Sequence, residues 1–192
     1  MILVNIHEVA NNKAGDCTID GYDDGKWFVA DSFSFGVERE MKESGEKGGT
    51  EDINIGVGEL QECTVSKSMD RASTLLAQFA INGNSLGPAE IHFVEVGGGG
   101  SAAGVPVCYL KYILARCFVK SWSTSGDADD RPTEEVAFYY NKIAFSYAHT
   151  KDGHTFIGCT PMAWNNVTHK KWDGHNISCD SSKGFNKGAP TS

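Results

Sequence analysis

The sequence VCYLKYILARCFVKSW, residues 107–122, decides the fold of this chain. Apolar side chains occupy both alternating faces of this stretch, with Cys108, Leu110, Tyr112 and Leu114 on one face and Val107, Tyr109, Ile113 and Val119 on the other. A strand with this pattern is buried on both sides. The cover comes either from the same domain or from a neighbouring subunit. The stretch therefore predicts a central strand of a mainly β protein.

Most of the chain around this strand also alternates with period two, which is typical of strands with one buried face. The alternation begins at Ile2, Val4 and Ile6. Between residues 27 and 37 it places one set of side chains on an apolar face: Trp27, Val29, Phe33, Phe35 and Val37. After Glu135 the parity shifts near Asn141, which predicts a bulge or sharp bend. The 22 glycines fit many turns between short strands.

One segment changes from period two to period 3.6. Its apolar stripe consists of Ala72, Leu75, Leu76, Phe79 and Ala80. The stripe predicts one helix over about residues 70–82, with Ser68 and Asp70 as candidate N-caps and Asn82-Gly83 as its end. This is the one helix that the sequence predicts, and it would seal one side of a sheet.

The alternation lapses in three places. Residues 38–58 are predicted to form a long exposed loop, residues 97–104 a glycine-rich turn, and residues from 174 onward an aperiodic tail. The predicted organisation is therefore a β-barrel domain over residues 1–173 and a C-terminal tail over residues 174–192 that is expected to be flexible.

The composition excludes several classes of partner. The formal net charge of −8 argues against nucleic acid, because binding to phosphates depends on Lys and Arg. No window is long and apolar enough for a membrane span, and Met1–Val9 does not have the pattern of a signal peptide. We expect a chain that begins in the cytoplasm, and any export must use a route other than a cleaved signal peptide.

The six cysteines form no C-x-x-C pair. Cys63, Cys108 and Cys117 lie within apolar strands and are predicted to be small buried residues. A disulfide between Cys159 and Cys179 is compatible with export, but the sequence alone does not decide it.

No catalytic or cofactor motif is present, so the sequence predicts neither an enzyme nor a cofactor site. Carboxylate pairs such as Asp23-Asp24, Asp129-Asp130 and Glu134-Glu135 are interpreted as solvated charge. The residue types that could bind zinc near the C-terminus are His149, His154, Cys159, His169, His175 and Cys179. Their spacing matches no standard zinc finger. The prediction is no metal, with His169, His175 and Cys179 as weak candidates.

Three ordered blocks carry a family resemblance: WFVADSFSFGV at residues 27–37, TVSKSMDRAS at residues 64–73, and the segments 121–126, 131–136 and 141–147. These blocks resemble the Hcp tube proteins of type VI secretion machines in order and spacing, with a fainter match over residues 160–172. The resemblance implies a two-sheet β-barrel, similar to phage tail-tube proteins, with one flanking helix.

The resemblance also implies a function. Hcp proteins are structural subunits that form hexameric rings, and the rings stack into a hollow tube that sheath contraction expels. The implied partners are further copies of the chain, the spike protein, the sheath and baseplate, and small effectors carried in the lumen.

Candidate contact residues follow from the doubly apolar strand over residues 107–119, from a sheet edge near residues 27–37 and from the exposed loop over residues 38–58. The candidates for contact within a ring are Phe33, Phe35, Tyr109, Lys111 and Ile113. The candidate segment for contact between stacked rings consists of Glu43, Ser44, Gly45, Glu46, Lys47, Gly48, Gly49 and Thr50.

Two other functions remain open at this stage. One is a monomeric β-sandwich that binds a surface or carbohydrate, with Trp122, Trp164 and Trp172 as a stacking platform. The other is a tube subunit whose residues after Tyr147 form an effector extension, although about 45 residues are few for an independent core.

Overall fold

A computed structural model describes residues 1–43, 53–96, 106–151, 155–180 and 184–185. In chain order the elements are β1 (Ile2–Ile6), α1 (His7–Asn11), β2 (Trp27–Ala30), β3 (Ser32–Ser34), β4 (Val37–Glu43), β5 (Ile53–Leu60), β6 (Cys63–Ser68), α2 (Ser73–Asn82), β7 (Gly87–Val96), β8 (Pro106–Ser125), β9 (Thr133–Tyr139), β10 (Lys142–Lys151), β11 (Thr155–Cys159), β12 (Met162–Asn165), β13 (Lys170–Lys171), β14 (Cys179–Asp180) and β15 (Gly184–Phe185).

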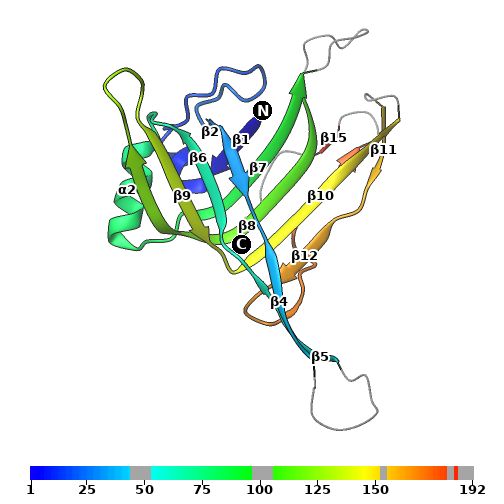
Figure 1. Cartoon of the computed structure of the whole chain (residues 1–192). Coiled ribbons are helices and arrows are strands. Elements are labelled where there is room, and N and C mark those ends of the chain that lie inside the picture. The colour runs from blue at the N-terminus through cyan, green and yellow to red at the C-terminus, as the bar shows by residue number, and fades with distance from the viewer. Residues whose placement is uncertain (44–52, 97–105, 152–154, 181–183, 186–192) are drawn as a thin grey trace.

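Two antiparallel sheets share β8. The larger sheet has the order β13-β12-β10-β8-β7-β1-β2, and β11 pairs with β10. The smaller sheet consists of β3, β6, β9 and the second half of β8. Figure 1 shows α2 on one side of the sheets. The predicted mainly β, two-sheet fold with a flanking helix is confirmed, although the sheets do not close into a complete barrel.

β8 is the strand that residues 107–122 predicted. Residues 110–115 pair with β10, whereas residues 118–125 pair with β9. The change of partner occurs at Arg116, whose φ of 60° lies in the left-handed region and bends the strand. Neighbouring Ile113 and Leu114 are both fully buried, on opposite faces of the strand. The prediction that this strand is covered on both sides is therefore correct.

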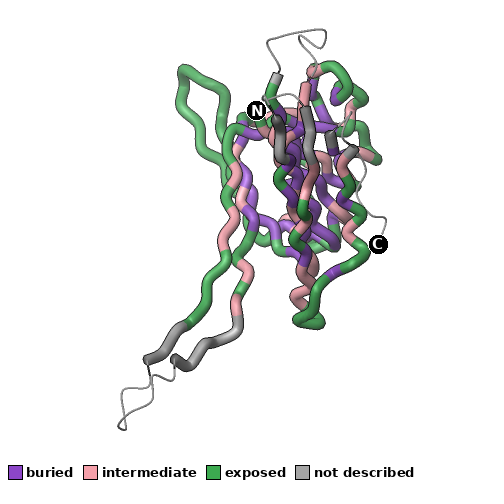
Figure 2. The backbone as a smooth tube through the Cα atoms, turned by 90° about the vertical axis from the view of Figure 1, so that its right-hand side faces the viewer, coloured by how far each residue is buried: buried purple, intermediate pink, exposed green. Residues whose placement is uncertain are grey.

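The two faces of the larger sheet belong to two hydrophobic cores. The first core lies between the sheets and beneath α2, and it includes Phe28, Leu76, Leu114 and Phe138. The second core lies on the opposite face and includes Trp27, Ile113 and Trp172. Buried segments run along both sheets in Figure 2. The longest strands are buried on both sides because each face has its own cover.

The predicted helix is present as α2, three residues shorter at its start. Neither predicted N-cap, Ser68 nor Asp70, occupies the cap position, which is Ala72. Asp70 instead accepts a hydrogen bond from the Ala72 backbone at 2.8 Å, just before the helix. Leu76 is fully buried, and Gly83 ends the helix with φ of 67° as predicted. The short helix α1 was not predicted, since five residues give too little helical periodicity.

The prediction of one continuous amphipathic strand over residues 27–37 is wrong. The chain forms β2 in the larger sheet and β3 in the smaller sheet, and the bend between them lies at Asp31. Phe28 is fully buried in the first core, whereas Val29 and Val37 are exposed. The bend changes which alternate residues face inward, so the single parity read from sequence does not persist.

The predicted bend near Asn141 is present between β9 and β10, where it carries the chain from one sheet to the other. Another segment differs from the expected pattern. Residues 38–58, predicted as a loop, include most of β4 and β5, which pair as an antiparallel hairpin. This hairpin projects from the body of the molecule (Figure 1). The strand pairing was not predicted, because the many Gly and Glu residues of this segment favour a loop.

The chain continues beyond β10 with additional short strands. A disulfide joins Cys159, at the end of β11, to Cys179 in β14. Ile177 and Phe185 are buried in the second core, so these described positions of the predicted tail pack against the larger sheet. The division at residue 173 stays a prediction. Among the described residues, no helix has the length and apolar composition to cross a bilayer.

Candidate assembly surface

Aromatic side chains gather on the face of the larger sheet that looks toward the smaller one. We define the aromatic face as Phe33, Phe35, Phe93, Tyr109, Tyr112, Phe145 and Tyr147. Tyr112 is central, because its ring stacks on Phe145 with centroids 5.0 Å apart and lies 4.8 Å from the ring of Phe33. In Figure 1 the upper parts of β7, β8 and β10 extend past the smaller sheet. The aromatic face continues onto this extension.

A β-bulge brings Tyr109 onto this face. The register between β7 and β8 shifts between Phe93 and Val94, where Leu110 and Cys108 are the successive partners. Tyr109 is the extra residue, and its ring lies 6.3 Å from the rings of both Phe93 and Tyr147. Residues 109 and 112 would point to opposite faces of a regular strand. The bulge therefore enlarges the aromatic face.

The aromatic face is only partly covered by the chain itself. Tyr147 is 54% exposed, and the other members are half-buried. Desolvation by burial and the proximity of Cys63 raise the pKa of Tyr112, so its phenol stays neutral. Contiguous exposed apolar area of this kind marks interaction surfaces in soluble proteins. The face is suited to contact with another protein surface.

The β4–β5 hairpin is fixed at its base beside this face. The Gln61 backbone donates a hydrogen bond to the Gly36 carbonyl at 2.9 Å, and the Tyr140 hydroxyl donates one to the Gln61 carbonyl at 2.6 Å. Of the predicted ring-stacking segment, Glu43 is the last residue of β4, and residues 44–50 lie outside the described residues. The role of this segment stays a prediction.

The predicted contact residues within a ring divide into two groups. Phe33, Phe35 and Tyr109 belong to the aromatic face, in β3, in the connection that follows it, and in β8. Lys111 and Ile113 have no exposed surface within the chain, so neither side chain is available for direct contact with another copy. Sequence reasoning missed Phe93, Tyr112, Phe145 and Tyr147 as contact candidates. The aromatic spacing in β10 was a signal that could have identified the last two.

Lys111 is buried because it belongs to an ionic network in the second core. Its Nζ lies 3.1 Å from Glu90 Oε2, which also contacts His92 Nε2 at 3.0 Å. His92 Nδ1 in turn contacts the Tyr22 hydroxyl at 3.2 Å. Burial alone would raise the pKa of Glu90, but the His92 hydrogen bond and the Lys111 charge outweigh it and lower the pKa. The network ties the segment before β2 to the sheet.

The smaller sheet presents a different outer face. We define the hydroxyl face as Ser32, Ser34, Thr64, Ser66, Ser121, Ser123, Ser125 and Thr133, which share one side of the paired strands. Ser32 Oγ and Ser66 Oγ lie 2.6 Å apart, and Ser125 Oγ lies 3.2 Å from Thr133 Oγ1. The exposed Glu135 lies on the same side, in register between Ser66 and Ser123, and it is the charged residue among these short hydroxyl side chains. This face is therefore hydrophilic.

The weak metal candidates do not converge in the described part of the chain. Cys179 is bonded to Cys159, so its sulfur is not a free thiolate ligand. His175 accepts a hydrogen bond from the Ile177 backbone, and His169 is exposed. Residues 1–43, 53–96, 106–151, 155–180 and 184–185 contain no cluster of three or more His, Cys, Asp or Glu side chains that could hold a metal ion.

The remaining cysteines and the tryptophans are packed. Cys63, Cys108 and Cys117 are buried as predicted, and desolvation raises the pKa of Cys63 and of Cys108 to about 12. Trp122 and Trp164 pack against the first core, whereas Trp172 is buried in the second. The three tryptophans therefore do not share one exposed stacking platform.

Comparisons with known proteins agree with this arrangement. A family model described as "Type VI secretion system effector, Hcp" matches residues 4–147. One solved structure, described as a type six secretion system protein, is 26% identical, covers 89% of this chain and 98% of its own, and has a TM-score of 0.73. No curated protein matches the chain in sequence.

Two further solved structures share the fold. Hcp1 from Salmonella typhimurium is 18% identical with a TM-score of 0.65, and the match covers 89% of this chain and 97% of that chain. A type VI secretion system effector from Yersinia pestis is 13% identical with a TM-score of 0.63, and the match covers 86% of this chain and 99% of that chain.

Proposed function

Because the chain belongs to the Hcp family of type VI secretion proteins, we propose that it is a structural subunit of the inner tube and not an enzyme. In this proposal six copies form a ring, rings stack into a hollow tube, and contraction of a sheath expels the tube. The spike protein and baseplate are its other partners, and small effectors travel in the lumen. The subunit is cytoplasmic when assembled, and the tube is then exported to the medium or a target cell.

The observation that carries this proposal is the aromatic face. Its rings are already in contact with one another, so a partner adds cover without ordering them first. The face is partly exposed in the single chain and lies next to β2 and β3, which pair on one side only among the described strands. A surface that fits a different surface of an identical copy closes into a ring when the rotation allows. Such closure would also cover the strand edge.

The hydroxyl face supports a position toward the lumen. Its hydroxyl side chains are short and hydrophilic and surround the exposed Glu135, so they offer cargo many weak hydrogen bonds and little apolar area. A wall of this kind lets a protein cargo pass without strong adhesion. The aromatic and hydroxyl faces thus have separate functions in the proposal, one for contact between copies and one for the pore.

The test measures ring formation by native mass spectrometry and negative-stain electron microscopy. We expect annular particles from the wild-type protein and mainly monomers from Tyr147→Glu, because a charge on the aromatic face must be desolvated when a copy docks. Ile81→Glu is the matched control, since Ile81 is 88% exposed on α2, away from the aromatic face. Monomeric wild-type protein at high concentration would contradict the proposal.

A further inference from the structure

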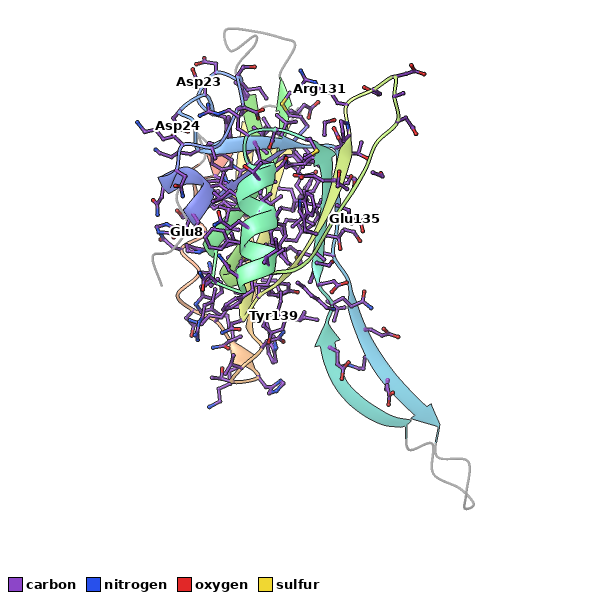
Figure 3. The ribbon with its side chains drawn as sticks, turned by 90° about the vertical axis from the view of Figure 1, so that its left-hand side faces the viewer. Glu8, Asp23, Asp24, Arg131, Glu135 and Tyr139 are labelled. Atoms are coloured by element: carbon purple, nitrogen blue, oxygen red, sulfur yellow. A yellow bond between two sulfur atoms is a disulfide. The ribbon has the colours of Figure 1, made fainter. Side chains whose placement is uncertain are left out.

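Two separate segments of the chain cover the face of the larger sheet that carries the second core. We define the first cover as residues 12–26, which precede β2, and the second cover as residues 172–180 with residues 184–185. Figure 3 shows Asp23 and Asp24 of the first cover at the end of the molecule opposite the β4–β5 hairpin. The two covers differ in the bonds that hold them to the sheet.

The first cover is held by hydrogen bonds. The Cys17 backbone donates one to the Trp27 carbonyl at 3.0 Å, and the Tyr22 hydroxyl contacts His92 Nδ1 at 3.2 Å. Cys17 is a buried free thiol, and burial raises its pKa, so the thiol stays protonated. The first cover is therefore held without a redox-active bond.

The second cover is held by packing and by a covalent bond. Trp172, Ile177 and Phe185 are buried in the second core. The backbone pairing of β14 with β15 lies within the cover itself. The disulfide joins Cys179 of β14 to Cys159 at the end of β11, and β11 pairs with β10 of the larger sheet. This bond therefore ties the second cover to the sheet.

Cys159 and Cys179 differ from the other four cysteines in their exposure. The pair is half-buried, whereas the other four are buried. Burial raises the pKa of Cys63 and of Cys108 to about 12, which suppresses the reactive thiolate form. The Cα atoms of the pair are 6.2 Å apart, within the range of about 4.4–6.8 Å that a disulfide needs. The pair is therefore the one that an external oxidant can reach and close.

The proposed route of the subunit crosses from a reducing to an oxidising compartment. Cytoplasmic thiols are kept reduced, whereas disulfides form and persist outside the cytoplasm. Both cysteines lie beyond residues 4–147, which the family model matches, so membership of the family does not by itself account for the pair. The position of the pair on the second cover gives it a separate role.

We propose that Cys159 and Cys179 are an oxidation site that is used only after export, as two thiols in the cytoplasmic tube and as a disulfide outside the cytoplasm. The reactant is a disulfide oxidant, such as oxidised glutathione. One thiolate of the pair attacks the oxidant and displaces one of its sulfurs, and the second thiolate then attacks the mixed disulfide and displaces the other. The pair loses two protons and two electrons, and the oxidant becomes two thiols. This inference rests on the proposed export of the tube.

Closing the disulfide changes how the second cover can open. As two thiols, the cover is held by its buried side chains and opens locally when they leave the second core. Such opening separates Cys179 from Cys159, and the disulfide prevents this separation. The exported subunit should therefore keep Ile177 and Phe185 in place after it has left the cytoplasm.

Thiol counting in a secreting strain tests when the disulfide forms. Cell and medium fractions are quenched in acid, unfolded and labelled with a maleimide polymer that shifts the gel band once for each thiol. We expect six labels on the cytoplasmic protein and four on the exported protein. Cys159→Ser/Cys179→Ser should carry four labels in both fractions. Cys63→Ser is the matched control, and it should carry five labels and then three, because it removes a buried thiol outside the pair.

Purified protein tests the pair without secretion. Addition of oxidised glutathione to the reduced wild-type chain should lower its intact mass by two hydrogen atoms and leave no lasting glutathione adduct. Cys159→Ser should instead retain one glutathione on Cys179. Hydrogen exchange of residues 172–180 should be severalfold slower in the oxidised chain than in the reduced chain. Exchange of α2 should be the same in both, since α2 packs on the first core.

The outcomes separate this inference from the proposed function. Absence of the chain from the medium would overturn the proposed export and the timing of oxidation together. Exported protein with six thiols, or cytoplasmic protein with four, would overturn only oxidation after export. Equal exchange of residues 172–180 in the two redox states, or wild-type chains that keep glutathione adducts, would overturn the role of the pair in holding the second cover.

Discussion

Lys67 Nζ lies 2.7 Å from Glu134 Oε1, and both side chains are fully buried between β6, β9 and the start of α2. Lys67 also contacts Asp70, and Glu134 accepts a hydrogen bond from the Trp122 indole at 2.9 Å. The pair links the smaller sheet to the helix. The two opposite charges neutralise each other in a site without water contact. Removing either side chain would therefore leave the other charge buried and unpaired.

Removing Lys67 alone should strongly destabilise the protein. We expect Lys67→Met to lower the free energy of unfolding by about 3–5 kcal/mol, because it leaves the Glu134 carboxylate buried without its counter-charge. Chemical denaturation followed by tryptophan fluorescence measures the loss. The double variant Lys67→Met/Glu134→Gln should be less destabilised than Lys67→Met. A double variant less stable than the single one would show that charge pairing is not the cause.

The packing of α2 should depend on Leu76. Leu76→Ala should lower the free energy of unfolding by about 2–5 kcal/mol, since it removes a fully buried side chain from the first core. Ile81→Ala is the control on the same helix, and its exposed side chain predicts a change within about 0.5 kcal/mol. Equal effects of the two substitutions in denaturant titrations would contradict the packing described for α2.

The Cys159–Cys179 disulfide should stabilise the C-terminal segment against the second core. The two cysteines are 20 residues apart, and closing a loop of this length corresponds to about 3 kcal/mol in the chain-entropy description. We expect a reductant to lower the thermal unfolding temperature of the wild-type protein. The double variant Cys159→Ser/Cys179→Ser should start lower and not respond to the reductant. An equal response in both proteins would place the effect at another site.

The buried Glu90 predicts a dependence of stability on pH. Its pKa is lowered from an ordinary value near 4.5, so the folded state favours the ionised carboxylate. Its contribution is complete above the unfolded pKa and is lost as the pH falls below about 4.5 through the lowered pKa. Glu90→Gln should lower the free energy of unfolding at neutral pH and reduce its decrease toward acid pH. Urea denaturation between about pH 3 and 7 measures both changes. The exposed Glu135→Gln should retain the wild-type profile.

The sequence pattern correctly predicted two elements whose formation depends mainly on neighbouring residues. The doubly apolar strand is β8, and the apolar stripe with its terminal Gly83 is α2. The bend at Asp31 was not predictable from alternation, because pairing of β3 with β6 moves the chain to another sheet. Residues 53–60 have a short apolar alternation at Ile53, Ile55 and Val57, but the Gly- and Glu-rich residues before them favoured a loop. These residues form β5 because β4 pairs with them.

The assembly surface was predictable only in part for a similar reason. The sequence predicted Phe33, Phe35 and Tyr109 as contact residues, because they lie near a sheet edge or in the doubly apolar strand. Whether Tyr109 and Tyr112 share a face depends on the bulge in β8, which arises from the register with β7. Lys111 was expected at an interface because it lies in the doubly apolar strand, but its side chain is buried and Glu90 on β7 compensates its charge.

The membership of β8 in both sheets has a mechanical consequence. A force applied to one sheet reaches the other through the covalent backbone of a single strand, and packing contacts need not transmit it. Relative rocking of the sheets would require a change in the dihedral angles near Arg116, which the strands on both sides hold in place. The shared strand therefore couples the two sheets into one mechanical unit.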